Sequence, residues 1–118
     1  MYKIYFYKDR KGNYPVFDYI KKLKTKNDKD SRIKSSKIND YIQALSVYGT
    51  QIGEPYLKHL EGEIWELRPL RDRILFAAWI DNSFVLLHTF VKKTQKTPKA
   101  EIEKAKKELS EIRQRGLE

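Results

Sequence analysis

Basic and hydroxyl side chains follow directly on an apolar, β-forming run near the C-terminal end of the chain. The run 86–91 is followed by Lys92, Lys93, Thr94, Gln95, Lys96, Thr97 and Pro98. Thr97 is expected to cap a helix whose first helical residue is Pro98. Lysines beside the positive end of a helix dipole attract phosphate, and Thr94 and Gln95 can add hydrogen bonds to it. The segment therefore predicts an anion-binding turn at a sheet edge.

Two arginines flank a second predicted turn. Arg68 precedes this turn and Arg73 follows it, each on a predicted strand. A guanidinium group is always charged and presents a planar fork to phosphate oxygens. Each arginine can instead pair with a nearby acid such as Glu66 or Asp72. Considered together with the three lysines, the pair favours phosphate binding.

Candidates for proton transfer are few. By strand alternation His88 lies on the same face as Leu86 and Phe90, where a lone histidine is most often a satisfied core residue. It is also a possible general acid or base, because its ordinary pKa lies near neutrality. Glu66 is the only carboxylate within a suggestive motif. No serine–histidine–aspartate pattern, glycine-rich phosphate loop or isolated carboxylate pair is present.

The composition limits the class of protein. The chain has 118 residues, which suits one domain over 1–118. Without cysteine it has neither a disulfide framework nor a thiolate metal site, and two histidines argue against a histidine-rich one. No metal and no cofactor are therefore expected. With no signal peptide and no membrane-length apolar run, we expect a cytoplasmic protein that does not bind a membrane.

Positive charge lies at the two ends of the chain. The net charge is +9, made up of +8 in residues 1–37, −3 in residues 38–90 and +4 in residues 91–118. Clustered positive charge favours a polyanionic partner, nucleic acid first. The competing interpretation is that these lysines lie on ordinary solvated helix faces.

Hydrophobic periodicity predicts an α+β fold with the order β-α-α-β-β-β-α. Polar breaks separate the two N-terminal helices, which should form a hairpin over one face of a small, antiparallel-rich sheet. A tight turn is expected at Asp81-Asn82. The predicted strands cover 1–7, 64–67, 73–80 and 84–91, and the predicted helices begin at 15 and cover 31–48 and 98–115.

The chain resembles toxins of the RelE/ParE superfamily. Within that superfamily it is similar to the phage-derived Gp49-like branch that includes HigB toxins. The resemblance is carried by residues 57–68 and 73–76 and by the run 86–98, continuing into Glu101 and Ala105. The predicted order of elements also suits the family, so the resemblance covers nearly the whole chain. Segments 62–76 and 86–98 are specific, whereas the two N-terminal helices are not.

The resemblance implies a type II toxin neutralised by a helix-turn-helix, HigA-like antitoxin. Such toxins commonly cleave mRNA on the translating ribosome without a metal. The ribose 2′-OH attacks the adjacent phosphate, and cationic side chains stabilise the charge that develops. The antitoxin is expected to cover part of the Arg68–Arg73–Lys93 surface or the N-terminal helices. Two alternatives stay open: a gyrase poison of the ParE type, and a non-catalytic RNA-binding module.

The resemblance also implies roles for individual residues. Arg73 matches a phosphate-stabilising arginine, and Arg68 matches a basic residue of the preceding strand. The run 92–96 lies where related enzymes carry a further arginine and sometimes a tyrosine. We therefore expect Arg68, Arg73, Lys93 and Lys96 to be catalytic and Lys92, Thr94 and Gln95 to bind substrate. The general base is left open between a lysine, Glu66 and His88, in that order.

Overall fold

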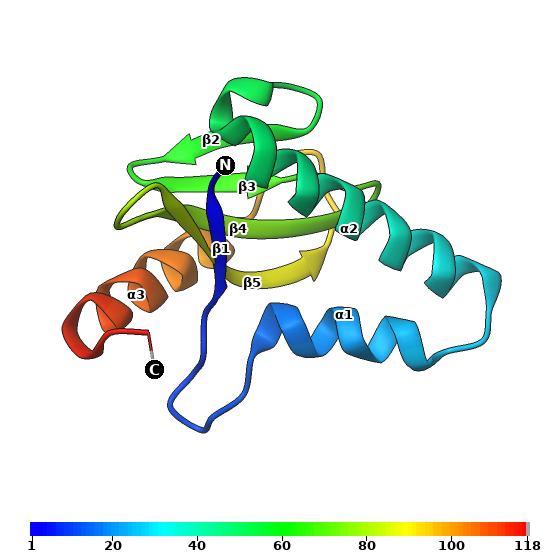
Figure 1. The fold of residues 1–118 in the computed structure, drawn as a ribbon, viewed down its shortest axis with the longest axis horizontal. Coiled ribbons are helices and arrows are strands. Elements are labelled where there is room, and N and C mark those ends of the chain that lie inside the picture. Colours follow the sequence, from blue (N-terminus) through cyan, green and yellow to red (C-terminus); the bar gives the residue numbers. More distant parts are fainter. Residues whose placement is uncertain (118) are drawn as a thin grey trace.

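One mixed sheet of five strands organises the molecule (Figure 1). The computed structural model describes residues 1–117. The strand order is β1-β5-β4-β3-β2, in which β1 runs parallel to β5 and the other neighbours are antiparallel. The elements are β1 (Lys3–Phe6), α1 (Pro15–Thr25), α2 (Lys29–Tyr48), the 3-10 helix η1 (Gly49–Ile52), β2 (Leu57–Glu61), β3 (Ile64–Leu67), β4 (Asp72–Trp79), β5 (Ser83–Val91) and α3 (Lys99–Arg115). The expected α+β fold is confirmed.

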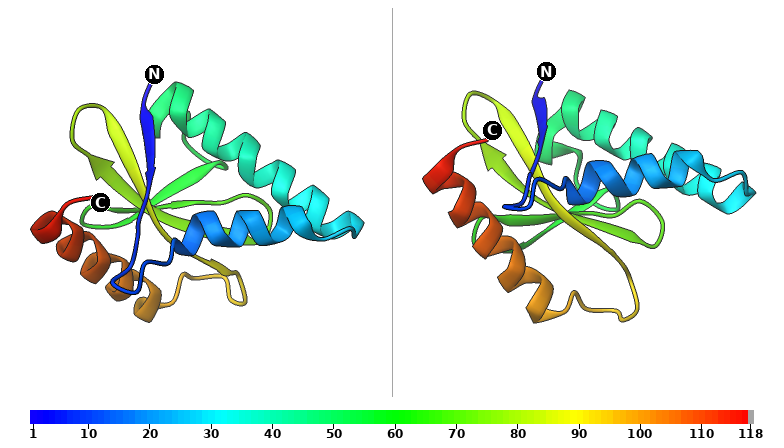
Figure 2. Two further views of the ribbon diagram at one scale, coloured as in Figure 1. Left: turned by 60° about the horizontal axis from the view of Figure 1, so that its bottom comes forward. Right: turned by 90° about the horizontal axis from the view of Figure 1, so that it is seen from below.

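Helices cover both faces of the sheet (Figure 2). The α1–α2 hairpin packs its apolar stripe, which includes Ile20, Ile38 and Leu45, on one face. Helix α3 packs Ala105, Leu109 and Ile112 on the other. Because both faces are buried, β4 and β5 are apolar at consecutive positions rather than at alternate ones.

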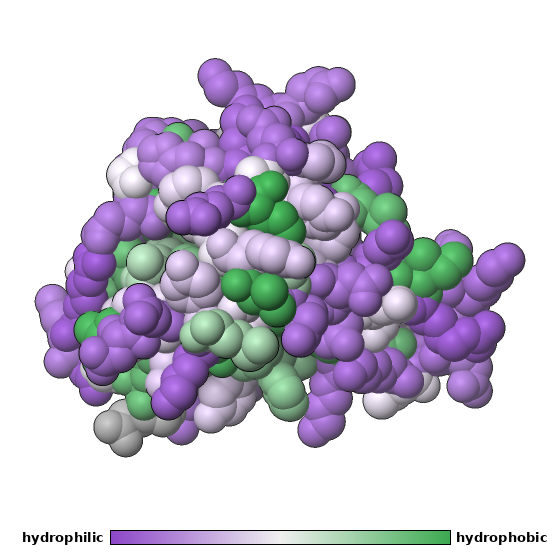
Figure 3. All heavy atoms as spheres, turned by 45° about the horizontal axis from the view of Figure 1, so that its top comes forward, coloured by the Kyte–Doolittle hydropathy of each residue, from purple (hydrophilic) through white to green (hydrophobic). Residues whose placement is uncertain are grey.

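The face of the molecule drawn in Figure 3 is mostly polar. Figure 3 shows hydrophilic side chains over most of one face, with apolar side chains in small separate patches. Within residues 1–117 no helix is both long enough and apolar enough to cross a membrane.

The sequence did not predict strand β2. Strand β2 pairs antiparallel with β3 and forms an outer edge of the sheet. Only Leu57 of this strand is buried, while Lys58 and His59 are exposed. An edge strand needs few apolar residues, so its periodicity is a weak signal.

A bulge in β5 changes the face on which His88 lies. Leu75 of β4 pairs with His88, but the next residue, Phe76, pairs with Leu86, which leaves Leu87 as an extra residue. Leu86 packs on the helical-hairpin side, whereas Leu87 packs on the α3 side. His88 also contacts α3. The expectation that His88 shares the face of Leu86 is therefore wrong, because the bulge shifts the alternation by one residue, whereas its expected position on the face of Phe90 is confirmed.

The start of α3 also differs from the prediction. Pro98 occupies the N-cap position with an extended ψ of 139°, and Lys99 is the first helical residue. Thr97 does not cap the helix, because its hydroxyl donates a hydrogen bond to Oε2 of Glu66 on β3. At the β4–β5 turn, Asp81 and Asn82 both adopt a φ of 54°, as the predicted tight turn requires.

Candidate functional site

Two hollows lie on either side of the loop that connects β5 to α3. Hollow A, of about 650 Å³, lies between this loop and β2–β3 and is lined by Lys58, Glu66 and Arg68 among others. Hollow B, of about 530 Å³, lies on the other side of the loop. Both hollows are lined by the same three loop residues, Gln95, Lys96 and Thr97. The loop therefore forms a shared wall between them.

Most of the predicted site residues gather around this loop. Hollow B is lined by Arg73, Lys92, Lys93, Thr94, Gln95 and Lys96. Arg68 and Glu66 line hollow A instead, and His88 lines neither hollow. The two arginines therefore do not converge on one ligand position, although the lysines do surround hollow B.

Glu66 links the two arginines to the loop. Its Oε1 atom lies 3.4 Å from Nε of Arg68 and 3.8 Å from Nε of Arg73, and its Oε2 accepts the hydroxyl of Thr97. Glu66 is buried, and both of its oxygens are engaged. Its carboxylate is thus occupied in holding Arg68 and the loop in place. Of the two acids considered for the arginines, Glu66 is the one they pair with.

Arg73 is a buried residue of the site. Its side chain is 8% exposed, and Nη1 donates to the carbonyl oxygens of Leu70 and Asp72 at 2.9 Å each. Burial lowers the pKa of the Arg73 guanidinium, and Glu66 opposes that shift. Leu70 adopts a left-handed φ of 56°, which the Arg73 contact helps to hold. Arg73 therefore fixes the turn behind hollow B while adding positive charge to its wall.

Asp72 has a separate role on the helical-hairpin face. Its Oδ1 accepts the Tyr19 hydroxyl at 2.6 Å, and the ammonium of Lys34 lies 3.7 Å away. Burial, together with this hydrogen bond, raises the pKa of Tyr19. The Asp72 carboxylate thus ties α1 and α2 to the start of β4, and among residues 1–117 it forms no ion pair with an arginine.

A buried histidine lies between two carboxylates on the α3 side of the sheet. Nδ1 of His88 lies 2.6 Å from Oε1 of Glu108, and Nε2 lies 2.9 Å from Oε1 of Glu101. Both ring nitrogens face acceptors, so both can donate only in the imidazolium form. The side chain of His88 is 2% exposed, so it has no direct access to a ligand.

Glu101 extends this arrangement to the surface. Its side chain is 30% exposed and lines hollow B, and its Oε2 accepts no hydrogen bond from residues 1–117. Hollow B therefore combines several cationic side chains with the carboxylate of Glu101, which the buried imidazole of His88 contacts through a hydrogen bond. Such a set of groups can bind a phosphodiester and accept a proton from a hydroxyl group beside it.

The sequence did carry a signal for Glu101. Glu101 and Glu108 are seven residues apart, which places them on one face of α3 together with the buried residues Ala105 and Ile112. Two carboxylates on the apolar face of a helix require polar partners from the sheet. His88 is the polar residue in the apolar strand opposite.

Among residues 1–117, no group of three or more histidine, aspartate or glutamate side chains is arranged to hold a metal ion.

A known protein family matches most of the chain. The family described as "phage derived protein Gp49-like (DUF891)" matches residues 18–110. The matched span extends from α1 into α3 and contains the whole loop between hollows A and B. No curated protein matches the chain.

Proposed function

The chain belongs to the phage-derived Gp49-like family, and from this membership we propose that it is the toxin of a type II toxin–antitoxin system. The family belongs to the RelE/HigB-like group of toxins, which generally pair with an antitoxin. We assign this chain to the HigB type, with a helix-turn-helix antitoxin as its partner. Its activity is that of a metal-independent endoribonuclease that cleaves mRNA on the translating ribosome.

One observation carries the proposal of RNA cleavage. Hollow B places Lys92, Lys93 and Lys96 around a partly exposed carboxylate, Glu101. Cations alone would suit any polyanion. A carboxylate within a cationic hollow repels phosphate, so its presence there favours a chemical role for it. Acceptance of a proton from a ribose 2′-OH is such a role.

Substrate binding falls to the loop and to Arg68. Lys92, Lys93 and Lys96 contact phosphates as point charges, whereas Arg68 can offer two parallel donors from hollow A. Gln95 adds hydrogen bonds to the RNA backbone. The hydroxyl of Thr94 donates to the carbonyl oxygen of Lys96 at 2.7 Å, so Thr94 also fixes the shape of the loop.

The chemical step is an internal transesterification. The 2′ oxygen attacks the adjacent phosphorus while its proton passes to Glu101, and the bond from phosphorus to O5′ breaks. Lys93 and Lys96 stabilise the charge on the phosphoryl oxygens, and one of their ammonium groups donates a proton to O5′. The products are a 2′,3′-cyclic phosphate and a 5′-hydroxyl end. The ribosome supplies the orientation of the RNA that this reaction requires.

Four residues act in this scheme by positioning other groups. His88 and Glu108 hold the carboxylate of Glu101, and Glu66 holds Arg68. Arg73 supports the turn behind hollow B and adds its charge to the field there. Because Glu66 and His88 are buried, Glu101 replaces them as the candidate general base.

Controlled expression in a bacterium tests the proposed function. The double variant Arg68→Ala, Lys93→Ala is compared with wild type and with Lys37→Ala, which removes an exposed charge on α2. New transcript 5′ ends within translated frames should appear with wild type and Lys37→Ala and be lost in the double variant. Growth arrest with DNA breaks instead would identify a gyrase poison. Absence of arrest would leave a basic binding module or an inactive toxin.

A further inference from the structure

Strand β1 leaves part of its backbone unpaired at the edge of the sheet. It pairs only with β5, in parallel. The amides of Lys3 and Tyr7 donate to the carbonyl oxygens of Asn82 and Leu86. Because backbone groups alternate in direction along a strand, the N–H and C=O groups of Ile4 and Phe6 point away from β5. They have no hydrogen-bond partner among residues 1–117.

Contacts at both ends define the open length of this edge. The amide of Tyr2 donates to the carbonyl oxygen of Ser46, and the hydroxyl of Ser46 donates back to the carbonyl oxygen of Tyr2. At the other end, Arg115 donates to the carbonyl oxygen of Lys8. The free edge is therefore the stretch around Ile4 and Phe6, which is the length of one short strand segment.

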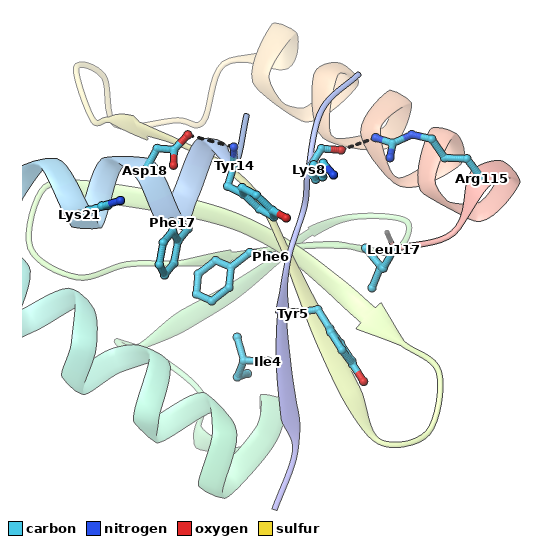
Figure 4. A pocket seen from close by; sticks show the side chains of 10 residues that line it. All are labelled: Ile4, Tyr5, Phe6, Lys8, Tyr14, Phe17, Asp18, Lys21, Arg115 and Leu117. Carbon is cyan, nitrogen blue, oxygen red and sulfur yellow. Dashed lines mark hydrogen bonds between the residues drawn. The ribbon is translucent and has the colours of Figure 1, made fainter. Parts of the chain in front are cut away.

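An apolar groove of about 550 Å³ accompanies the open edge (Figure 4). Ile4, Phe6 and Phe17 lie on one side of β1, and Tyr5 and Leu117 lie on the other. Phe17 and Tyr5 are exposed, although they are large and largely apolar. A strand laid along β1 would place its successive side chains alternately on these two sides.

The charge around the groove selects the chemistry of its occupant. Lys8, Lys21 and Arg115 line the groove, with Asp18 as its only lining acid among residues 1–117. Asp18 is engaged at the start of α1, where its Oδ2 accepts the amide of Tyr14. A second copy of this chain would bring further lysines to the edge, which disfavours self-pairing. The groove suits an extended, acidic segment.

We propose that an extended acidic segment of the antitoxin binds in this groove and pairs with β1 as a sixth strand. This inference rests on the proposed toxin function. Main-chain hydrogen bonds to Ile4 and Phe6 give affinity, while alternate apolar side chains beside Phe17 and Tyr5 give specificity. The groove shares no lining residue with hollows A and B, so the antitoxin anchors there without entering the site of RNA cleavage.

Residue-resolved amide hydrogen exchange tests the pairing. The partner is the co-expressed protein that restores growth, and the free toxin is compared with the purified complex. The amides of Ile4 and Phe6 should exchange at least tenfold more slowly in the complex. Those of Lys3 and Tyr7, already paired with β5, serve as internal controls for general stabilisation. Unchanged exchange at Ile4 and Phe6 in a neutralised complex would overturn the proposal.

Charge reversal provides the second arm. The variant Lys8→Glu, Lys21→Glu should weaken the complex at least tenfold, while the free toxin still arrests growth. The matched control is Lys22→Glu, Lys24→Glu, which makes the same charge change on exposed residues of α1 outside the groove. Equal weakening of the complex by both variants would mean that net charge alone causes the effect. It would contradict binding of the antitoxin segment in the groove. If the wild-type chain neither arrests growth nor is neutralised by any partner, the toxin function itself fails and this inference with it.

Discussion

Oε1 of Glu101 lies 2.9 Å from Nε2 of His88, so the first turn of α3 is joined to the bulged part of β5. The bulge turns His88 toward α3, and the helix start brings Glu101 to the wall of hollow B. Among the carboxylates around the loop, Glu66 has both oxygens engaged, whereas Glu101 keeps one oxygen without a partner among residues 1–117. This difference identifies the candidate base.

Glu101→Gln should slow RNA cleavage by about 100- to 10,000-fold, the range that general acid–base catalysis contributes. The amide keeps the size of the side chain but cannot accept the proton. The measurement is single-turnover cleavage of mRNA on purified translating ribosomes. Glu103→Gln, an exposed neighbour on α3, is the control and should cleave like wild type. A Glu101→Gln protein that folds and cleaves at the wild-type rate would remove Glu101 from the reaction.

Glu66→Ala should destabilise the fold by about 3 kcal/mol, because Arg73 would remain buried without its carboxylate. Thr97→Val should cost about 1 kcal/mol, since it removes only one hydrogen bond to Glu66. Urea denaturation of both variants and wild type measures these free energies of unfolding. Equal stabilities for wild type and Glu66→Ala would show that the ion pair does not hold the site together.

Acid should weaken the fold through Glu111. Hydrogen bonds from Tyr7 and Arg115, with Arg10 adding to them, lower the pKa of Glu111 from its ordinary 4.5 to about 2. Because the folded-state pKa lies below the unfolded one, this stabilisation is present above pH 4.5 and is lost as the pH falls toward 2. Thermal unfolding followed across this window should show a shallower loss in Glu111→Gln than in wild type. If wild type and Glu111→Gln lost stability in parallel as the pH fell, ionised Glu111 would not be the source of this stabilisation.

RNA binding should weaken as the salt concentration rises. Each contacted phosphate adds to the slope of the logarithm of affinity against the logarithm of salt concentration. For single strands, the logarithm of affinity falls by about 0.7 per contacted phosphate for each tenfold rise in salt. Lys93→Ala should reduce that slope by about 0.7. Lys37→Ala should leave it unchanged, because Lys37 lies on α2 and lines neither hollow. A slope unaffected by Lys93→Ala would exclude Lys93 from phosphate contact.

The sequence predicted the elements whose apolar patterns are strong. The α1–α2 hairpin, β3 and α3 were found within a few residues of their observed bounds. Strand β2 was missed because an edge strand buries little. Local capping rules placed Thr97 at the helix start, but Glu66, distant in sequence, takes its hydroxyl. Partners that only the fold brings together cannot be predicted from local spacing.

The sequence predicted that the residues of the candidate site lie close together. It did not predict the contacts that they make with one another. The lysines of the loop do surround one hollow, as their close spacing suggested. Arg73 was expected at the phosphate. It lines hollow B, and its guanidinium also closes the turn before β4, a second role that local spacing did not predict. The bulge at Leu87 separates His88 from the face of Leu86 and places it on the α3 side, where it contacts Glu101. A bulge depends on pairing with another strand, so strand alternation alone could not predict it.

The chemical nature of the RNA ends tests the central claim most directly. Wild-type protein and Glu101→Gln are incubated with translating ribosomes, and the new ends of the mRNA are assayed for 5′-hydroxyl and 2′,3′-cyclic phosphate groups. We predict both groups with wild type, their loss when the nucleotide 5′ to the cut carries a 2′-deoxyribose, and a strong reduction with Glu101→Gln. New ends that carry a 5′-phosphate, or cleavage that persists beside a 2′-deoxyribose, would contradict attack by the 2′ oxygen.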